Sequence, residues 1–95
     1  MRTSKIRPAI VISNDEYNGK FDDIVAVPLT TNLKFRDYTF VITSKDLEWG
    51  ELIKESNVKA DRIFSVDKKL VRLTIGRVNR NIHRRIREII SELIK

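Results

Sequence analysis

Short apolar runs, each about the length of one strand, make up most of the chain before its C-terminal end. Some of them alternate apolar and polar positions, which is the period of a half-buried strand. Turn-forming residues separate the runs. The pattern therefore predicts strand regions at residues 10–13, 24–27, 37–43, 57–66 and 71–78.

The segments between these runs predict turns and loops. Residues 14–19 are rich in turn formers. Pro28 is expected to end the second strand, because a proline cannot donate a ladder hydrogen bond. Residues 44–55 predict a loop with a short helical turn, and Trp49 within it is interpreted as a packing residue rather than a base-stacking one.

The end of the chain has a helical period. Isoleucine and leucine recur there at spacings of three and four, which is the stripe of an amphipathic helix, and Asn79 is expected to cap its start. Short strands without helical crossovers, followed by one helix, predict a mainly β fold: a curled antiparallel sheet or small SH3-like barrel with a C-terminal helix. We expect the stripe to pack on the sheet or on a second subunit; it comprises Ile82, Ile86, Ile89, Ile90, Leu93 and Ile94.

Length and composition set limits on the class of protein. With 95 residues, we expect residues 1–95 to form one domain. No apolar run approaches the about 18 residues of a membrane span, so we expect no membrane association. The chain has no cysteine, which is compatible with a reducing, cytoplasmic location.

The charge is basic and unevenly distributed. The chain has 19 Lys and Arg against 13 Asp and Glu, and a net charge of +6. No acid lies between Lys68 and Arg87, where basic residues are frequent. This distribution favours a polyanionic partner, and the alternative is a helix with a solvated basic face.

The sequence lacks the residues that several classes of enzyme require. His83 is the only histidine, which excludes a two-histidine nuclease, and its position in the arginine-rich start of a helix argues against a Ser-His-Asp triad. A zinc site is not expected without cysteine. Asp22 and Asp23 are weak magnesium candidates, because adjacent side chains of a strand point to opposite faces. We expect no metal and no cofactor.

One hydrolytic reaction needs neither a metal nor a protein nucleophile. RNA can be cleaved by its own 2′-hydroxyl if the protein orients the strand, moves protons and stabilises charge on the phosphate. An arginine provides forked donors that match phosphate oxygens. Arg7 precedes Pro8, which favours extended backbone, so Arg7 is expected to project from the mouth of the first strand as a solvated charge or an anion receptor.

Four sequence blocks, in this order, resemble the MazF/PemK family of toxins from type II toxin–antitoxin systems. They are KIRPAIVIS at residues 5–13, IVAVPLTT at 24–31, SNVKADRI at 56–63 and IGRV at 75–78. The resemblance implies a metal-independent, sequence-specific endoribonuclease that cleaves single-stranded mRNA. It also implies a homodimer and an acidic antitoxin as partner.

The resemblance also implies the site residues. These are Arg7, Thr30 and Asp61. From the chemistry of their side chains we expect Arg7 to stabilise charge on the phosphate, Thr30 to donate to a non-bridging oxygen, and Asp61 to be the base. Lys59 stands where one branch of the family has an arginine, so a point charge replaces a bidentate fork. The residues implied to contact RNA are Lys5, Thr31, Ser56, Lys59 and Arg62.

Two alternatives use the same fold without catalysis: a nucleic-acid-binding module and a protein-interaction domain. The chain also departs from the family at its start. Family members usually begin with a further strand containing a Gly-Asp pair, then a loop over the active site, where this sequence has only residues 1–5. We therefore expect a sheet edge with unpaired backbone groups.

Overall fold

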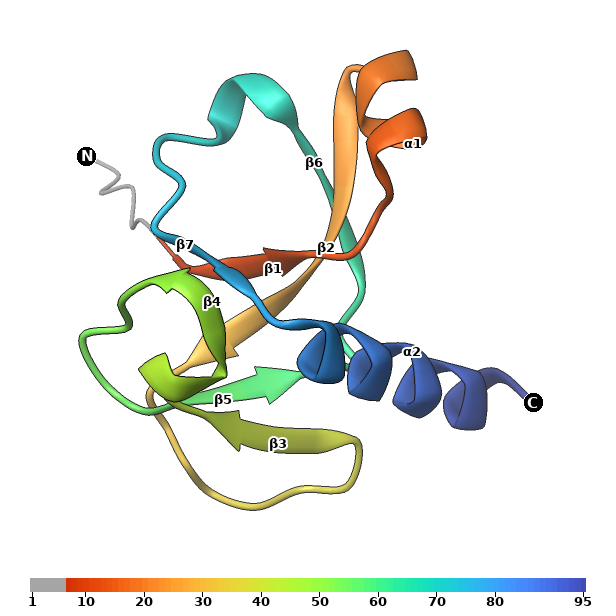
Figure 1. Cartoon of the computed structure of the whole chain (residues 1–95). Coiled ribbons are helices and arrows are strands. Elements are labelled where there is room, and N and C mark those ends of the chain that lie inside the picture. The colour runs from red at the N-terminus through yellow and green to blue at the C-terminus, as the bar shows by residue number, and fades with distance from the viewer. Residues whose placement is uncertain (1–6) are drawn as a thin grey trace, which may run out of the picture.

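The computed structural model describes residues 7–95, which form two antiparallel sheets and a C-terminal helix (Figure 1). The larger sheet has the order β1-β2-β5-β3, with β6 also paired to β2, and β4 pairs with β7. This confirms the predicted mainly antiparallel β fold with a C-terminal helix. The elements are β1 (Ala9–Val11), α1 (Asp15–Lys20), β2 (Asp23–Thr30), β3 (Thr39–Ile42), the 3-10 turn η1 (Ser44–Asp46), β4 (Leu47–Gly50), β5 (Ser56–Lys59), β6 (Phe64–Asp67), the 3-10 turn η2 (Lys68–Leu70), β7 (Gly76–Val78) and α2 (Arg80–Ile94).

The second strand does not end at Pro28, as the sequence predicted, but continues to Thr30. Leu29 N–H donates to the Pro8 carbonyl in the direction of β1. Because successive N–H groups of a strand point to opposite edges, the position of the missing Pro28 N–H faces the other edge of β2. On that edge the pairing with β6 ends at Ala26 and the pairing with β5 begins at Leu29, so no ladder bond is lost.

The predicted strand at residues 57–66 is two strands, β5 and β6, which pair with different parts of β2. A turn separates them, with the Arg62 amide donating to the Lys59 carbonyl at 3.0 Å. The predicted strand at residues 71–78 is also shorter, because only Gly76–Val78 pairs with β4.

Two other segments are more ordered than predicted. The turn expected at residues 14–19 is the short helix α1, because the Asn14 side chain accepts from the Tyr17 amide at 2.8 Å and caps it. In residues 44–55 the helical turn is present as η1, but β4 was missed. Trp49 lies on β4 and is 54% exposed, so it is not part of the buried core.

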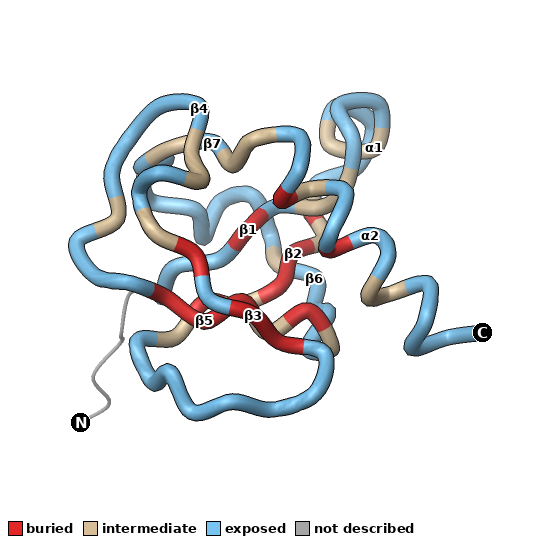
Figure 2. The backbone as a smooth tube through the Cα atoms, turned by 60° about the horizontal axis from the view of Figure 1, so that its bottom comes forward, coloured by how far each residue is buried: buried red, intermediate tan, exposed pale blue. Residues whose placement is uncertain are grey.

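The core lies between the larger sheet and the first half of α2. Figure 2 shows buried positions along β2, β5 and β3 and at the start of α2. The helix begins at Asn79, whose side chain accepts from the Ile82 amide at 3.0 Å, as predicted. Ile82 and Ile86 belong to the core, whereas Ile94 is 73% exposed near the chain end. The sheet is therefore the partner of the first part of the apolar stripe.

None of the helices within residues 7–95 is long and apolar enough to cross a membrane.

Candidate functional site

The register of the sheet brings Arg7 next to Thr30. Ala9 pairs with Pro28, and the Leu29 amide donates to the Pro8 carbonyl, so continuing this register places Arg7 opposite Thr30. Arg7 is exposed, as expected for a side chain at the mouth of the first strand. The Thr30 Oγ1 accepts from the Asn32 amide at 3.2 Å, which leaves its hydroxyl proton available to an incoming ligand.

Asn57, on the neighbouring strand β5, lies beside Thr30. It pairs with Thr30 on one side and with Val41 on the other, and paired residues of an antiparallel ladder project from the same face. Asn57 is 2% exposed. Its Nδ2 donates to the Lys34 carbonyl at 3.2 Å and to the Asn32 carbonyl at 3.4 Å. Asn57 therefore fixes the loop that follows Thr30 over this face of the sheet.

The same loop supplies the partner of Asp61. Arg36 Nη2 lies 2.7 Å from Asp61 Oδ2, and the Asp61 side chain is only 9% exposed. The Arg36 carbonyl also accepts from the hydroxyl of Thr39 at 2.6 Å, which joins the loop to β3. Asp61 Oδ1 is buried and has no hydrogen-bond partner among the described atoms.

Asp61 does not lie in line with Arg7 and Thr30 across the sheet. Asn57 pairs with Thr30, whereas Asp61 follows in the turn beyond β5. Lys59 lies between the two places and, with its partner Thr39, is on the same face as Asn57. Thr30, Asn57 and Lys59 therefore share this face, and Asp61 lies in the turn that follows β5.

The remaining predicted RNA contacts differ in exposure. Ser56 is 5% exposed, and its hydroxyl donates to the Lys54 carbonyl, so it offers little surface to a ligand. Thr31 and Arg62 are exposed, whereas Lys5 lies outside the described residues.

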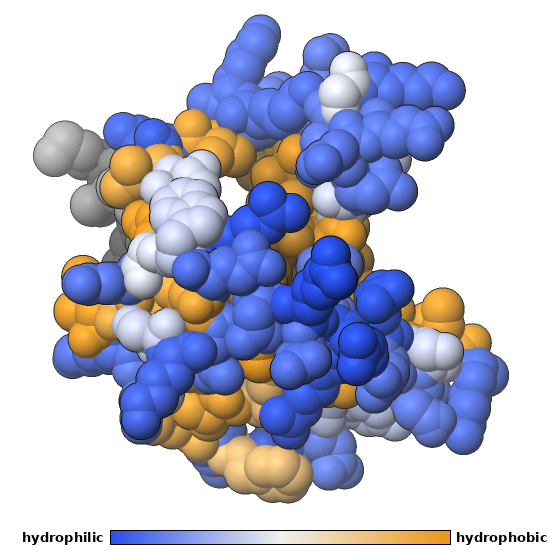
Figure 3. Space-filling model, in the orientation of Figure 1, coloured by the Kyte–Doolittle hydropathy of each residue, from blue (hydrophilic) through white to orange (hydrophobic). Residues whose placement is uncertain are grey.

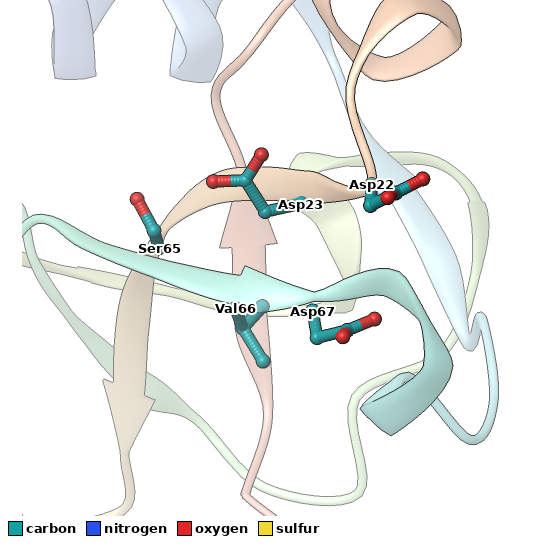
Figure 4. Close-up of a pocket in the computed structure, with 5 residues that line it drawn as sticks. All are labelled: Asp22, Asp23, Ser65, Val66 and Asp67. Carbon is teal, nitrogen blue, oxygen red and sulfur yellow. The ribbon is translucent and has the colours of Figure 1, made fainter.

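The magnesium candidates lie elsewhere, at an open cavity of about 300 Å³ between β2 and β6. Figure 4 shows the carboxylates of Asp22 and Asp23 pointing away from each other. Within residues 7–95 no cluster of His, Asp or Glu side chains is suited to hold a metal ion.

Sequence reasoning missed Asn57 and Arg36. An asparagine next to the apolar Val58 in a strand region was the available signal for Asn57, because a buried amide needs hydrogen-bond partners. Arg36 had no such signal, since its partner is 25 residues away in the chain.

Comparison with protein families agrees with this geometry. Residues 2–94 match the model of the PemK-like, MazF-like toxins of type II toxin–antitoxin systems. The chain belongs to this toxin family. The match spans the Arg7, Thr30 and Asp61 blocks together. Comparison with curated protein sequences gave no significant match.

Solved structures of PemK/MazF toxins share the fold. The chain matches the Mycobacterium tuberculosis toxin MazF-mt6 with a TM-score of 0.76 and 16% identity, covering 90% of this chain and 83% of that one. It matches MazE-MazF from Deinococcus radiodurans with a TM-score of 0.77 and 22% identity, covering 93% and 84%. A mycobacterial endoribonuclease in complex with its cognate antitoxin matches with a TM-score of 0.76 and 23% identity, covering 90% and 78%.

Proposed function

We propose that this PemK/MazF-family toxin is an endoribonuclease that cleaves single-stranded RNA, including mRNA, without a metal ion. The observation that carries the proposal is the pairing register that places Arg7 opposite Thr30 on one face of the sheet. A guanidinium and a hydroxyl at this spacing supply one charged and one neutral donor to a phosphate. The family of the chain and the endoribonuclease names of two of its structural relatives support the same activity.

In the proposed reaction, the 2′-oxygen of a ribose attacks the adjacent phosphorus and the bond from phosphorus to the 5′-oxygen breaks. The products are a 2′,3′-cyclic phosphate and a 5′-hydroxyl, with the 5′-oxygen taking its proton from solvent. Arg7 stabilises the additional negative charge of the pentacoordinate phosphate, and Thr30 donates to a non-bridging oxygen.

Asp61 is the proposed base. Arg36 holds its Oδ2 and its Oδ1 is buried, so the ion pair with Arg36 must open before the carboxylate accepts the 2′-hydroxyl proton. Lys59, on the same face, is positioned to attract the phosphates between the two ends of the site. Thr31, Arg62, Ser56 and Lys5 remain proposed RNA contacts.

The partners follow from the same assignment. The structural relatives include a toxin bound to its cognate antitoxin and MazE-MazF. We therefore propose an acidic antitoxin as the partner, a homodimer as the oligomeric state and the cytoplasm as the location. Sedimentation at micromolar concentration tests the homodimer, and a stable monomer would contradict it.

The experiment that tests the activity uses a long single-stranded RNA in the presence of EDTA. Cleavage sites are mapped, and an oligonucleotide spanning one site is then made with and without a 2′-deoxy substitution at the cleaved nucleotide. We expect cleavage in EDTA, cyclic phosphate ends by mass spectrometry, and no cleavage of the deoxy substrate. Cleavage that is lost in EDTA and restored by magnesium would reject the mechanism, and binding without cleavage would indicate a nucleic-acid-binding module.

A further inference from the structure

We infer that bound RNA opens the ion pair between Arg36 and Asp61, because a phosphate of the strand takes the Arg36 guanidinium from the Asp61 carboxylate. Arg36 is then a further RNA-binding residue, and it holds Asp61 until a substrate is in place. The inference rests on the proposed function, in which Asp61 is the base. It adds the event that makes this carboxylate available, and binding measurements that need no cleavage can test it.

The contact with Asp61 uses only part of the Arg36 guanidinium. Arg36 Nη2 lies 2.7 Å from Asp61 Oδ2, and within residues 7–95 this is the only hydrogen bond of the Arg36 side chain. A guanidinium has five donors in a planar fork, and the Arg36 side chain is 51% exposed, so water reaches the remaining donors. A phosphodiester group offers two non-bridging oxygens to such a fork. It therefore accepts two parallel hydrogen bonds in place of one.

The Asp61 carboxylate is incompletely satisfied in the closed pair. Its side chain is 9% exposed, and its buried Oδ1 has no hydrogen-bond partner among the described atoms. A buried acceptor without a partner costs free energy, and a ligand that brings a donor lowers this cost. The 2′-hydroxyl of a bound ribose is such a donor. RNA therefore compensates both members of the pair, with a phosphate for Arg36 and a hydroxyl for Asp61.

The backbone on both sides of Arg36 is fixed, so the exchange requires only a rotation of the side chain. The Arg36 carbonyl accepts from the Thr39 hydroxyl at 2.6 Å and from the Thr39 amide at 3.2 Å. The Lys34 carbonyl, two residues earlier, accepts from Asn57 Nδ2 at 3.2 Å. The Arg36 backbone therefore keeps its place in the loop while the guanidinium changes partner.

The loop that carries Arg36 connects the two ends of the proposed RNA site. It begins directly after Thr30 and ends at Thr39, which pairs with Lys59. Every residue of the loop is exposed, and Phe35, next to Arg36, is 79% exposed. In the space-filling view, hydrophobic surface borders hydrophilic surface at the lower edge of the molecule, where this loop lies in Figure 1 (Figure 3). An exposed aromatic ring beside a cation is typical of surfaces that bind single strands.

A permanent structural pair is the alternative to this exchange. In that case Arg36 stays on Asp61 when RNA binds, and the pair contributes only to stability. The two cases differ in one measurable respect. Exchange makes Asp61 a competitor of RNA for the guanidinium, whereas a permanent pair does not. A double-mutant cycle on RNA affinity measures this competition.

The test measures affinity for the 2′-deoxy oligonucleotide of the cleavage experiment, which binds without being cleaved. A single-stranded RNA of mixed sequence replaces it if no site is cleaved. Asp61→Asn removes the competing charge and is expected to tighten binding by about threefold or more. In the background of Arg36→Ala, the same substitution is expected to change affinity little, because no guanidinium is left to compete for. Arg36→Ala alone is expected to weaken binding and to lower its salt dependence by about one phosphate contact.

Asp37→Asn is the matched control for the loss of a negative charge. Asp37 is an exposed acid of the same loop and forms no ion pair within residues 7–95. Its removal lowers the repulsion of RNA but frees no guanidinium, so its effect should be equal with and without Arg36→Ala. Lys20→Ala, on α1 at the other end of β2, is the control for the loss of a positive charge. Circular dichroism verifies that each variant is folded.

NMR and kinetics give two further readouts. The Nε–Hε signal of Arg36 is identified by its absence from the spectrum of Arg36→Lys, and it is expected to shift when the oligonucleotide is added. The carboxyl carbon signal of Asp61 is expected to shift at the same RNA concentration. In cleavage, Arg36→Ala is expected to raise KM with little loss in kcat, because the Asp61 carboxylate is then free at all times.

The outcomes separate this inference from the proposed function. Equal effects of Asp61→Asn with and without Arg36→Ala would overturn the inference, and so would an Arg36 signal that RNA does not shift. Either result would leave RNA cleavage as proposed, with the pair as a structural contact. RNA binding with the expected coupling but without cleavage would reject the catalytic proposal and support the exchange. The absence of RNA binding would reject both.

Discussion

Arg36 and Asp61 lie 25 residues apart in the chain and form an ion pair, with 2.7 Å between Arg36 Nη2 and Asp61 Oδ2. The pair joins the loop after β2 to the turn after β5. Arg62, the sequence neighbour of Asp61, forms no ion pair with it among the described residues. The amide of Arg62 closes the turn instead, and the turn presents Asp61 to the loop.

Removing Arg36 is expected to destabilise the fold. Arg36→Ala leaves the nearly buried Asp61 carboxylate without its partner, and an unsatisfied buried polar group costs about 1–3 kcal/mol. Because the Arg36 side chain is half-exposed, water replaces part of the contact, so we expect a loss of about 1 kcal/mol in the free energy of unfolding, measured with urea.

Arg77→Ala is the matched control for this measurement. Arg77 Nε lies 3.8 Å from Glu48 Oε2, and both side chains are well exposed. Such a pair contributes little, so its loss is expected to change stability by less than about 0.5 kcal/mol. Equal effects of the two variants would show that the Arg36–Asp61 pair contributes no more than a surface pair.

Asn57→Ala is expected to release the loop after β2. The variant loses the hydrogen bonds from Asn57 Nδ2 to the carbonyls of Asn32 and Lys34. Phe35 in this loop is 79% exposed, so chymotrypsin is expected to cut after it faster in the variant. Cleavage after the exposed Leu73 serves as an internal reference and should keep its rate. An unchanged rate at Phe35 would show that other contacts hold the loop.

Gly50→Ala is expected to disrupt the β4–β7 pair. Gly50 has a φ of +91°, and a Cβ there would collide with the Ile75 carbonyl oxygen and with Gly76 Cα. A strained backbone of this kind costs about 1–3 kcal/mol, and the collision adds to it. The thermal unfolding midpoint should fall clearly.

Gly19→Ala is the control for Gly50→Ala. A Cβ at Gly19 meets nothing within 4 Å, and the residue lies in helix α1. Alanine is favoured over glycine in a helix by about 0.5–1 kcal/mol, so we expect an unchanged or higher unfolding midpoint. A fall as large as that of Gly50→Ala would contradict the steric explanation.

Arg7→Ala and Thr30→Ala are expected to lower RNA cleavage without unfolding the chain. The loss of one preorganised donor to a transition state costs roughly 10²–10³ in rate. Asp61→Asn keeps the shape of the side chain but removes the proposed base. We therefore expect this variant to cleave RNA more slowly than the unmodified chain. Ser91→Ala, on the exposed side of α2, is the control and should cleave as the unmodified chain does. Unchanged cleavage by Arg7→Ala would show that the assignment of this residue is wrong.

The sequence by itself determined the local features of this protein. Ile10 and Val27 mark strands because apolar residues of strand length must be buried, and Asn79 marks the start of α2 because its side chain caps the helix. The basic C-terminal third and the Arg7 and Thr30 blocks were also readable, since charge and short motifs are properties of neighbouring residues.

Only the tertiary structure decided which distant residues meet. The strand β2 continues through Pro28 because the position of the missing N–H faces a gap between the pairing with β6 and the pairing with β5. The positions of β5 and β6 along β2 decide this. Arg36 reaches Asp61 only after the loop folds over β5. Residues 71–75 have the alternation of a strand, but a strand forms only where another chain segment completes its hydrogen bonds. Pairing between segments far apart in the sequence therefore decided where strands end and which side chains meet, because local sequence preference does not determine either.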